Sequence, residues 1–169
     1  MDSPLTTEPE TRRFLAEFVR YVKPKVVVET GCHEGDTSLE LSIALQGFGH
    51  LHTCDIEERH VSETFNRVLP YTAHVHNCTG TEMIRNLTEP VDVAFLDSGG
   101  ELQRVKEAVE LMPKLAPVAW VFLHDALQTQ DPCYRNICAL TNWHSLILPY
   151  GRGLAMFYIG NERIKNQLG

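Results

Sequence analysis

The chain has 169 residues, of which 43% are hydrophobic, and its 15 Lys and Arg against 22 Asp and Glu give a net charge of −7. This length suits one domain with a single core, and the acidic balance argues against a nucleic-acid backbone or an anionic membrane as the main partner. No apolar run is long enough to span a membrane, and residues 1–10 do not resemble a signal peptide, so we expect a cytoplasmic protein.

Continuous apolar runs alternate with stretches of helical periodicity along nearly the whole chain. The expected helices are 10–22, 37–46, 58–69, 81–87, 101–115 and 132–140. The expected strands are 25–29, 50–54, 73–76, 91–96, 118–123, 145–148 and 154–159. The β-branched, uninterrupted strands are typical of a parallel sheet that helices cover on both faces. The last two strands are joined by a short link rich in turn residues, which predicts an antiparallel hairpin.

This pattern predicts a single α/β domain over residues 1–169. It would consist of an N-terminal helical segment (1–24), a core of sheet and helices (25–160) and a polar tail (161–169). The five cysteines include no Cys-x-x-Cys pair, so we expect them to pack as small apolar residues rather than to form disulfides or a zinc site.

Polar residues follow four of the expected strands. The first strand leads into the loop 29–38, the second ends at Asp55, the fourth at Asp97, and the fifth at His124 and Asp125. Ligands of open α/β sheets bind at the carboxyl ends of the strands. Carboxylates near a buried sheet are costly unless they are paired or meet a ligand, so the sequence predicts a functional site at this edge.

The loop after the first strand contains two glycines that let the backbone turn tightly and approach a ligand, Gly31 and Gly35. The dinucleotide fingerprint Gly-x-Gly-x-x-Gly is absent, and Glu34 and Asp36 would repel a diphosphate, which argues against a nicotinamide-dependent oxidoreductase. Asp55 follows at a distance suited to an acidic residue that binds both hydroxyls of a ribose. A nucleoside without phosphates fits this combination better.

With its Glu-x-Gly-x-x-x-Gly-x-Ser/Thr loop, the chain resembles the class I S-adenosylmethionine-dependent methyltransferases, particularly the small O-methyltransferase branch. The resemblance extends over about residues 12–159, and the matching segments are 26–38, 52–58, 91–100, 120–126 and 148–159. It implies a Rossmann-like, doubly wound sheet of seven strands in the order 3-2-1-4-5-7-6 with strand 7 antiparallel. The hairpin predicted above from the turn residues agrees with this order.

The resemblance also implies roles for individual residues. The residues that would bind the cofactor S-adenosylmethionine are Glu29, Thr30, Gly31, Gly35, Thr37, Ser38, Asp55, Ile56, Gly80, Thr81 and Asp97. Within this set, Asp55 would hold the ribose hydroxyls, Ile56 would pack on adenine, and Asp97 would lie near the sulfonium and the substrate. The candidates for catalysis, which requires alignment and deprotonation of the acceptor, are Asp97, His124, Asp125 and His33.

Several O-methyltransferases of this pattern hold a divalent cation at the ends of strands four and five, and Asp97 with Asp125 resembles half of that arrangement. Oxygen ligands suit Mg²⁺. Ala126 and Ser98-Gly99-Gly100 stand where further ligands are common, so the sequence leaves Mg²⁺ dependence open.

The remaining histidines (His50, His52, His60, His74, His76 and His144) are expected on strands or helices away from the cleft. Arg152 is expected to be a solvated turn residue.

These observations favour an enzyme that transfers a methyl group to a small-molecule acceptor, with oxygen as the expected acceptor atom, and without a nucleic-acid or membrane partner. One alternative is a protein that binds S-adenosylmethionine or another nucleoside and transfers nothing, and another is a protein or N-methyltransferase. Asp97-Ser98-Gly99-Gly100 stands in place of the amino-methylating Asn/Asp-Pro-Pro-Tyr signature, which argues against base methylation. Because little sequence lies outside the core, a homodimer partner would be a way to complete the acceptor pocket.

Overall fold

A computed structural model describes residues 6–127 and 132–160 of the chain. The helices are α1 Pro9–Val22, α2 Asp36–Ala44, α3 Glu58–Val68, α4 Gly80–Asn86, α5 Glu101–Leu111 and α6 Cys133–Leu140, with a 3-10 helix, η1, at Met112–Lys114. The strands are β1 Val26–Thr30, β2 His50–Asp55, β3 Ala73–Asn77, β4 Val91–Leu96, β5 Leu115–Leu123, β6 His144–Leu148 and β7 Leu154–Ile159. The tail expected at 161–169 lies outside the described residues.

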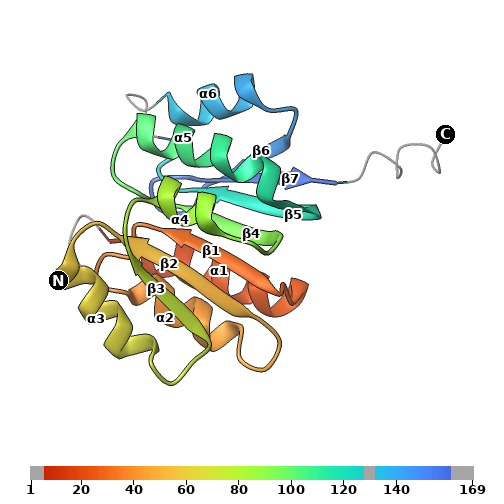
Figure 1. Ribbon diagram of the computed structural model, residues 1–169. Helices are drawn as coiled ribbons and strands as arrows, with labels where there is room; N and C mark the ends of the chain where they lie inside the picture. Colours follow the sequence, from red (N-terminus) through yellow and green to blue (C-terminus); the bar gives the residue numbers. More distant parts are fainter. Residues whose placement is uncertain (1–5, 128–131, 161–169) are drawn as a thin grey trace.

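The strands form one seven-stranded sheet in the order β3-β2-β1-β4-β5-β7-β6 (Figure 1). The first five strands pair in parallel, whereas β7 runs antiparallel to both β5 and β6. The implied strand order and the predicted terminal hairpin are therefore confirmed. Because β1 and β4 are neighbours although they are far apart in sequence, the strand order reverses between them, and a crevice opens there at their carboxyl ends.

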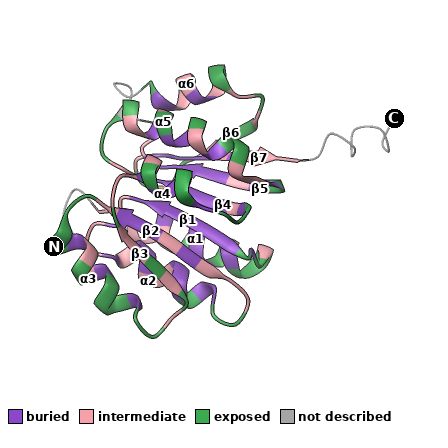
Figure 2. Ribbon diagram, viewed as in Figure 1, coloured by how far each residue is buried: buried purple, intermediate pink, exposed green. Residues whose placement is uncertain are grey.

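Helices cover both faces of the sheet, α1 to α3 on one and α4 to α6 on the other (Figure 1). All five residues of β1 are buried (Figure 2). Alternate side chains of this strand enter opposite cores. Val27 packs in the core with Leu41 of α2, whereas Val28 packs in the core with Leu111 of α5. Truncating a fully buried leucine such as Leu111 to alanine would cost about 2 to 5 kcal/mol.

The expected boundaries mostly agree with the structure, but the helix expected at 101–115 is too long. α5 ends at Leu111, because Pro113 lacks the backbone N–H that would continue the helix, and a 3-10 turn follows. Leu115 already belongs to β5, which is longer than the strand expected at 118–123.

All five cysteines are free thiols, as expected from the sequence. Among the helices of the described segments, none is long and apolar enough to cross a membrane.

Candidate functional site

A pocket of about 290 Å³ lies at the carboxyl ends of β1, β2 and β4. Its wall contains residues from the loop after β1, from the β2–α3 connection, and from the end of β4, together with Thr6 and Thr7 of the N-terminal segment. The lining residues that the sequence singled out are Gly31, His33, Thr37, Asp55, Ile56 and Asp97. The predicted edge of the sheet therefore does form a concave site.

Both glycines of the loop after β1 are required by geometry. Gly31 has φ +79°, and a Cβ there would lie 2.7 Å from the carbonyl oxygen of Asp97. Gly35 has φ +82°, and a Cβ there would lie 2.7 Å from Oγ1 of Thr64. The backbone N–H groups of Gly31 and Cys32 both donate to the carbonyl of Cys54, which ties the loop to the end of β2. The loop thus keeps a fixed shape at the pocket floor.

Asp55 ends β2 with its carboxylate held in place by backbone donors. Oδ2 accepts from the N–H of His33 at 3.0 Å, and Oδ1 accepts from the N–H of Glu57 at 3.0 Å. Each carboxylate oxygen can accept more than one hydrogen bond, so acceptor capacity remains for a ligand. A pair of vicinal hydroxyls is one kind of ligand that such a carboxylate can bind.

Next to Asp55, the pocket wall is apolar and aromatic. Ile56 lines the pocket with 70% of its surface exposed, an unusual position for a large aliphatic side chain. The ring of His33 lies 4.4 Å from the ring of His60, between centroids, and both residues line the pocket. The expectation that His60 lies away from the cleft is therefore wrong: α3 begins directly after Asp55, so its first turn faces the pocket.

Glu29, Thr30 and Ser38 lie beneath the pocket and are fully buried. Glu29 accepts hydrogen bonds from the hydroxyls of Ser38 and Thr53, the latter at 2.6 Å. Burial raises the pKa of Glu29 to about 7, and the nearby carboxylates of Asp97 and Asp55 add to the rise. Glu29 therefore supports the loop from below and does not line the pocket itself.

A chain of hydrogen bonds joins the end of β4 to the N-terminal segment through His124. Nδ1 of His124 lies 2.9 Å from Oδ1 of Asp97, and Nε2 lies 2.8 Å from Oε2 of Glu8. The other oxygen of Asp97 accepts from the hydroxyl of Thr7 at 2.7 Å. His124 itself is fully buried and does not line the pocket.

The protonation of His124 follows from these partners. Burial alone would lower the pKa of the imidazole, but the hydrogen bonds to Asp97 and Glu8 and the charge of Asp125 outweigh it and raise the pKa to about 9. His124 is therefore an imidazolium at neutral pH, and it cannot accept a proton from an acceptor.

Arg152 and Asp125 complete this charged group. Nε of Arg152 lies 3.0 Å from Oε1 of Glu8 and 2.9 Å from Oδ1 of Asp125. The guanidinium of Arg104, which is buried, lies 3.8 Å from Asp125 and donates to the carbonyl of His124 at 2.9 Å. Arg152 lies in the turn of the terminal hairpin, as expected, with 34% of its side chain exposed, and the hairpin also brings this side chain onto two carboxylates.

Asp97, His124 and Asp125 offer ligand atoms that all lie within 4.8 Å of one another. The set nonetheless fits Mg²⁺ poorly. Mg²⁺ prefers oxygen ligands, whereas His124 offers nitrogens, and both of these face carboxylates. In addition, Asp125 already forms an ion pair with Arg152. The charges of the three carboxylates of the group are already matched by His124 and two arginines.

Two cofactor candidates, Gly80 and Thr81, lie at the start of α4 and are not part of the pocket lining. The preceding residue, Thr79, forms a capping box with Glu82, a standard way to begin a helix. Gly80 is buried, and a Cβ there would collide with the carboxylate of Glu107, which accepts from Thr30 at 2.8 Å. These contacts give Gly80 a packing role.

The acidic residues of the loop also have partners. Asp36 lines the pocket and pairs with Arg67 and, at 3.3 Å, with Arg12. Glu34 lines the pocket as well.

Sequence reasoning missed Thr6, Thr7 and Glu8, which reach the site from the N-terminal segment. No local pattern marks them, since Glu8 and His124 are 116 residues apart. His60 could have been found from its place in the first turn after Asp55.

Comparison with known proteins agrees with this fold. Among curated proteins, none matches the chain. Solved structures with the same fold include a methyltransferase from Geobacter sulfurreducens (TM-score 0.79, 16% identity, 92% of this chain and 81% of that one). Another is the O-methyltransferase from Bacillus cereus in complex with SAH (TM-score 0.77, 16% identity, 93% of this chain and 84% of that one). A third is an rRNA methylase from Streptococcus thermophilus (TM-score 0.68, 14% identity, 91% of this chain and 98% of that one).

A family model described as a methyltransferase domain matches residues 28–126, which extend from β1 to just past His124 and Asp125. This segment contains the glycine loop, Asp55 and Asp97, and it makes up more than half of the chain. The chain belongs to this methyltransferase domain family.

Proposed function

We propose that the chain transfers a methyl group from S-adenosylmethionine to an oxygen atom of a small-molecule acceptor. This proposal rests most on Asp55, which lines the pocket next to the exposed Ile56. The loop after β1 lines the same pocket, and its two glycines leave no room for a side chain. The Bacillus cereus O-methyltransferase, which shares the fold, was solved in complex with SAH.

The pocket suits an adenosyl group on chemical grounds. Asp55 would accept from the two ribose hydroxyls, and Ile56 would lie against the adenine ring, as the resemblance implies. Glu34, which lines the pocket, disfavours a diphosphate, whereas the charge of Asp36 is paired with Arg12 and Arg67. The volume of about 290 Å³ is at the lower end of the range for small-molecule pockets.

When bound, S-adenosylmethionine would supply an electrophilic methyl group on a positively charged sulfur. Asp97 would provide a carboxylate near that charge, and His124, as an imidazolium between Asp97 and Glu8, would fix the orientation of the Asp97 carboxylate.

His33 is the better candidate for proton acceptor. It lines the pocket, and because its Nδ1 is buried, Nε2 is the nitrogen that would meet an acceptor. A ring nitrogen at the pocket wall can take the proton of an acceptor hydroxyl as the oxygen attacks the methyl group. We therefore assign deprotonation to His33, charge stabilisation near the sulfonium to Asp97, and positioning to His124, with Asp125 holding Arg152 beside it.

The cofactor assignment is tested by titration calorimetry with S-adenosylmethionine, S-adenosylhomocysteine and NAD. We expect micromolar binding of the first two and none of NAD. Asp55→Asn should weaken binding by about 1 to 3 kcal/mol, or about 5- to 150-fold, because it removes charge-assisted bonds to the ribose. Glu63→Gln on α3, a residue that does not line the pocket, is the matched control. Equal affinities of wild type and Asp55→Asn would refute the assignment.

The acceptor is tested by a screen of phenols, alcohols and carboxylic acids, with formation of S-adenosylhomocysteine as the readout. His33→Gln should lower kcat by about 100- to 10,000-fold, the usual contribution of a general base, with cofactor affinity retained. His144→Gln on β6 serves as control. Transcribed rRNA is included because the rRNA methylase shares the fold and the length, and methylation of RNA instead of small molecules would overturn the acceptor assignment.

We also propose that the chain folds as a single domain and acts in the cytoplasm. We further propose that it forms a homodimer in which the second copy covers the mouth of the pocket. Light scattering of the purified protein would give a dimer mass in that case, and a monomer that retains full activity would exclude the second copy.

A further inference from the structure

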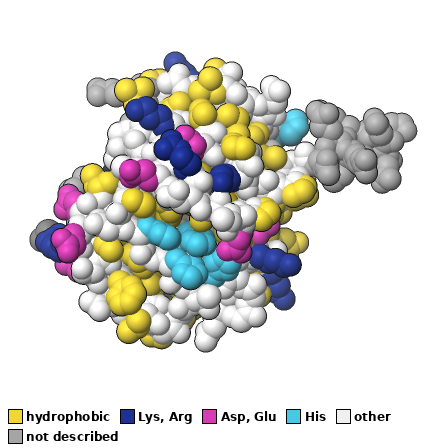
Figure 3. Space-filling model, in the orientation of Figure 1, with side chains coloured by type: hydrophobic (Ala, Val, Ile, Leu, Met, Phe, Trp, Pro, Cys, Tyr) yellow, Lys and Arg dark blue, Asp and Glu magenta, His cyan; other side chains and the backbone are white. Residues whose placement is uncertain are grey.

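Four of the eight histidines lie on the edge of the sheet opposite the terminal hairpin, outside the site described above. His50 and His52 belong to β2, and His74 and His76 belong to the edge strand β3. His52 is paired in register with His74, and side chains two residues apart on a strand point to the same face. The rings therefore share one face of the sheet, where they form a continuous patch in Figure 3.

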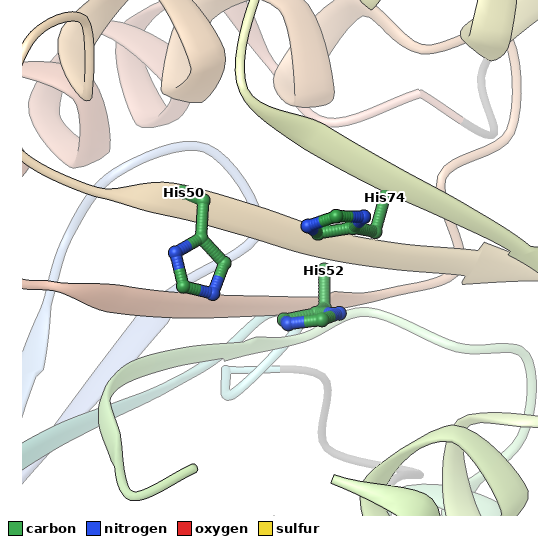
Figure 4. Close-up of side chains that lie close together, drawn as sticks. All are labelled: His50, His52 and His74. Atoms are coloured by element: carbon green, nitrogen blue, oxygen red, sulfur yellow. The ribbon is translucent and has the colours of Figure 1, made fainter. Parts of the chain in front are cut away.

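Three of these rings are close enough to share one ion. His50, His52 and His74 each offer a ring nitrogen within 4.8 Å of those of the other two (Figure 4). The rings of His52 and His74 stack at 4.8 Å between centroids, and the ring of His50 stands edge-on to His52 at 5.1 Å. Two nitrogens bound to one Zn²⁺ at about 2.0 to 2.1 Å are closer together than this, and the lone pairs of stacked rings do not converge. The rings of His52 and His74 would therefore have to turn to other rotamers to bind one ion.

A carboxylate lies beside two of these rings. Oε1 of Glu89, in the connection before β4, is 3.2 Å from Nε2 of His50 and 4.0 Å from Nε2 of His52. Three imidazoles and one carboxylate form a nitrogen and oxygen set that suits tetrahedral Zn²⁺.

The hydrogen bonds of His52 leave one nitrogen available. Its Nδ1 lies 3.2 Å from Nε2 of His76, so the two rings share a hydrogen bond. Its Nε2 is buried and makes no hydrogen bond to any described residue. With the proton on Nδ1 donated to His76, Nε2 of His52 presents a lone pair, and His76 serves as the outer partner that metal-bound histidines usually have.

A pocket of about 140 Å³, lined by His52, His76 and Glu89 among others, gives an ion a path to the cluster.

We propose that His50, His52, His74 and Glu89 form a zinc site that clamps the edge strand β3 and the connection before β4 to β2. This site is separate from the methyl-transfer pocket, and none of its four residues lines that pocket. Its place on an otherwise exposed edge indicates a structural role, because three chain segments would be joined by one ion.

The test uses the untagged protein and ZnCl₂ alone, in equilibrium dialysis and calorimetry at pH 7.5. We expect one zinc ion bound at the cluster, and we expect His50→Gln, His52→Gln and His74→Gln each to weaken its binding by at least about 10-fold, the smallest loss typical of removing even an outer partner of a ligand. His144→Gln removes a histidine from β6 and should leave zinc affinity unchanged.

Two measurements keep the outcome interpretable. Zinc should raise the melting temperature of the wild type and not that of His74→Gln, whose side chain is exposed and whose loss should not unfold the protein. Asp125→Asn separates this cluster from the group at the end of β5: zinc binding that persists in all three histidine variants and disappears in Asp125→Asn would overturn the proposal. So would the absence of zinc binding at millimolar concentration.

Discussion

The imidazolium of His124 should make the stability of the protein depend on pH in a defined window. In the folded chain the pKa of His124 is raised from 6.5 to about 9 by Asp97, Glu8 and Asp125, against the opposing effect of burial. The raised pKa means that the folded state binds the proton more tightly than the unfolded state does. The stabilisation is fully present below pH 6.5 and is lost as the pH rises through 9.

The magnitude follows from the shift. One pKa unit corresponds to 1.36 kcal/mol, so a rise from 6.5 to about 9 contributes about 3 kcal/mol to the free energy of unfolding. This is a large fraction of the total for a single domain. Urea unfolding of the wild type and of His124→Gln at intervals from pH 6 to pH 9 would measure it, with the other titrating groups common to both proteins.

We expect the wild type to lose about 3 kcal/mol relative to the variant across this range. NMR titration of the His124 ring gives an independent value of its pKa. Parallel pH dependences of the two proteins, or a ring that titrates near 6.5, would refute the reasoning, and would return His124 to the candidates for proton acceptor.

Two further predictions concern the loop and the charged group. Gly31→Ala should destabilise the fold by at least about 1 kcal/mol from the positive φ and by more from the collision with Asp97, and it should weaken cofactor binding. Gly47→Ala is the control, because Gly47 also has a positive φ but no atom lies within 4 Å of the added Cβ. Urea unfolding of this variant measures the backbone effect alone. Equal losses of stability in the two variants would argue against the collision at Gly31. Methyl transfer should survive EDTA, because cations of the chain already pair with Asp97 and Asp125; a loss of turnover that Mg²⁺ restores would show that they hold a metal.

The sequence sufficed for the fold because its signals are local. The β-branched run of β1 and the apolar run of β4 mark strands buried on both faces, and turn residues mark the hairpin. The strand order itself came from the resemblance rather than from periodicity. The end of α5 was missed because the apolar pattern continues through Pro113 into β5.

The candidate site was predictable only in part. Asp55 and Asp97 were found because each ends a strand, and this topology places such ends at one edge. Glu8 and Arg152 were not found, because they meet only when the first helix and the last hairpin are both in place, 144 residues apart. The burial of His124 and its protonation likewise depend on partners distant in the sequence.

The position of the N-terminal segment has a practical consequence for protein engineering. Thr6 borders the pocket, so a domain fused on the amino-terminal side would join the fold beside the ligand site. β7 ends at the opposite end of the strands, since Ile159 pairs with Ala119, four residues before β5 ends at Leu123. A fusion on the carboxyl-terminal side is therefore the better choice for binding and activity assays.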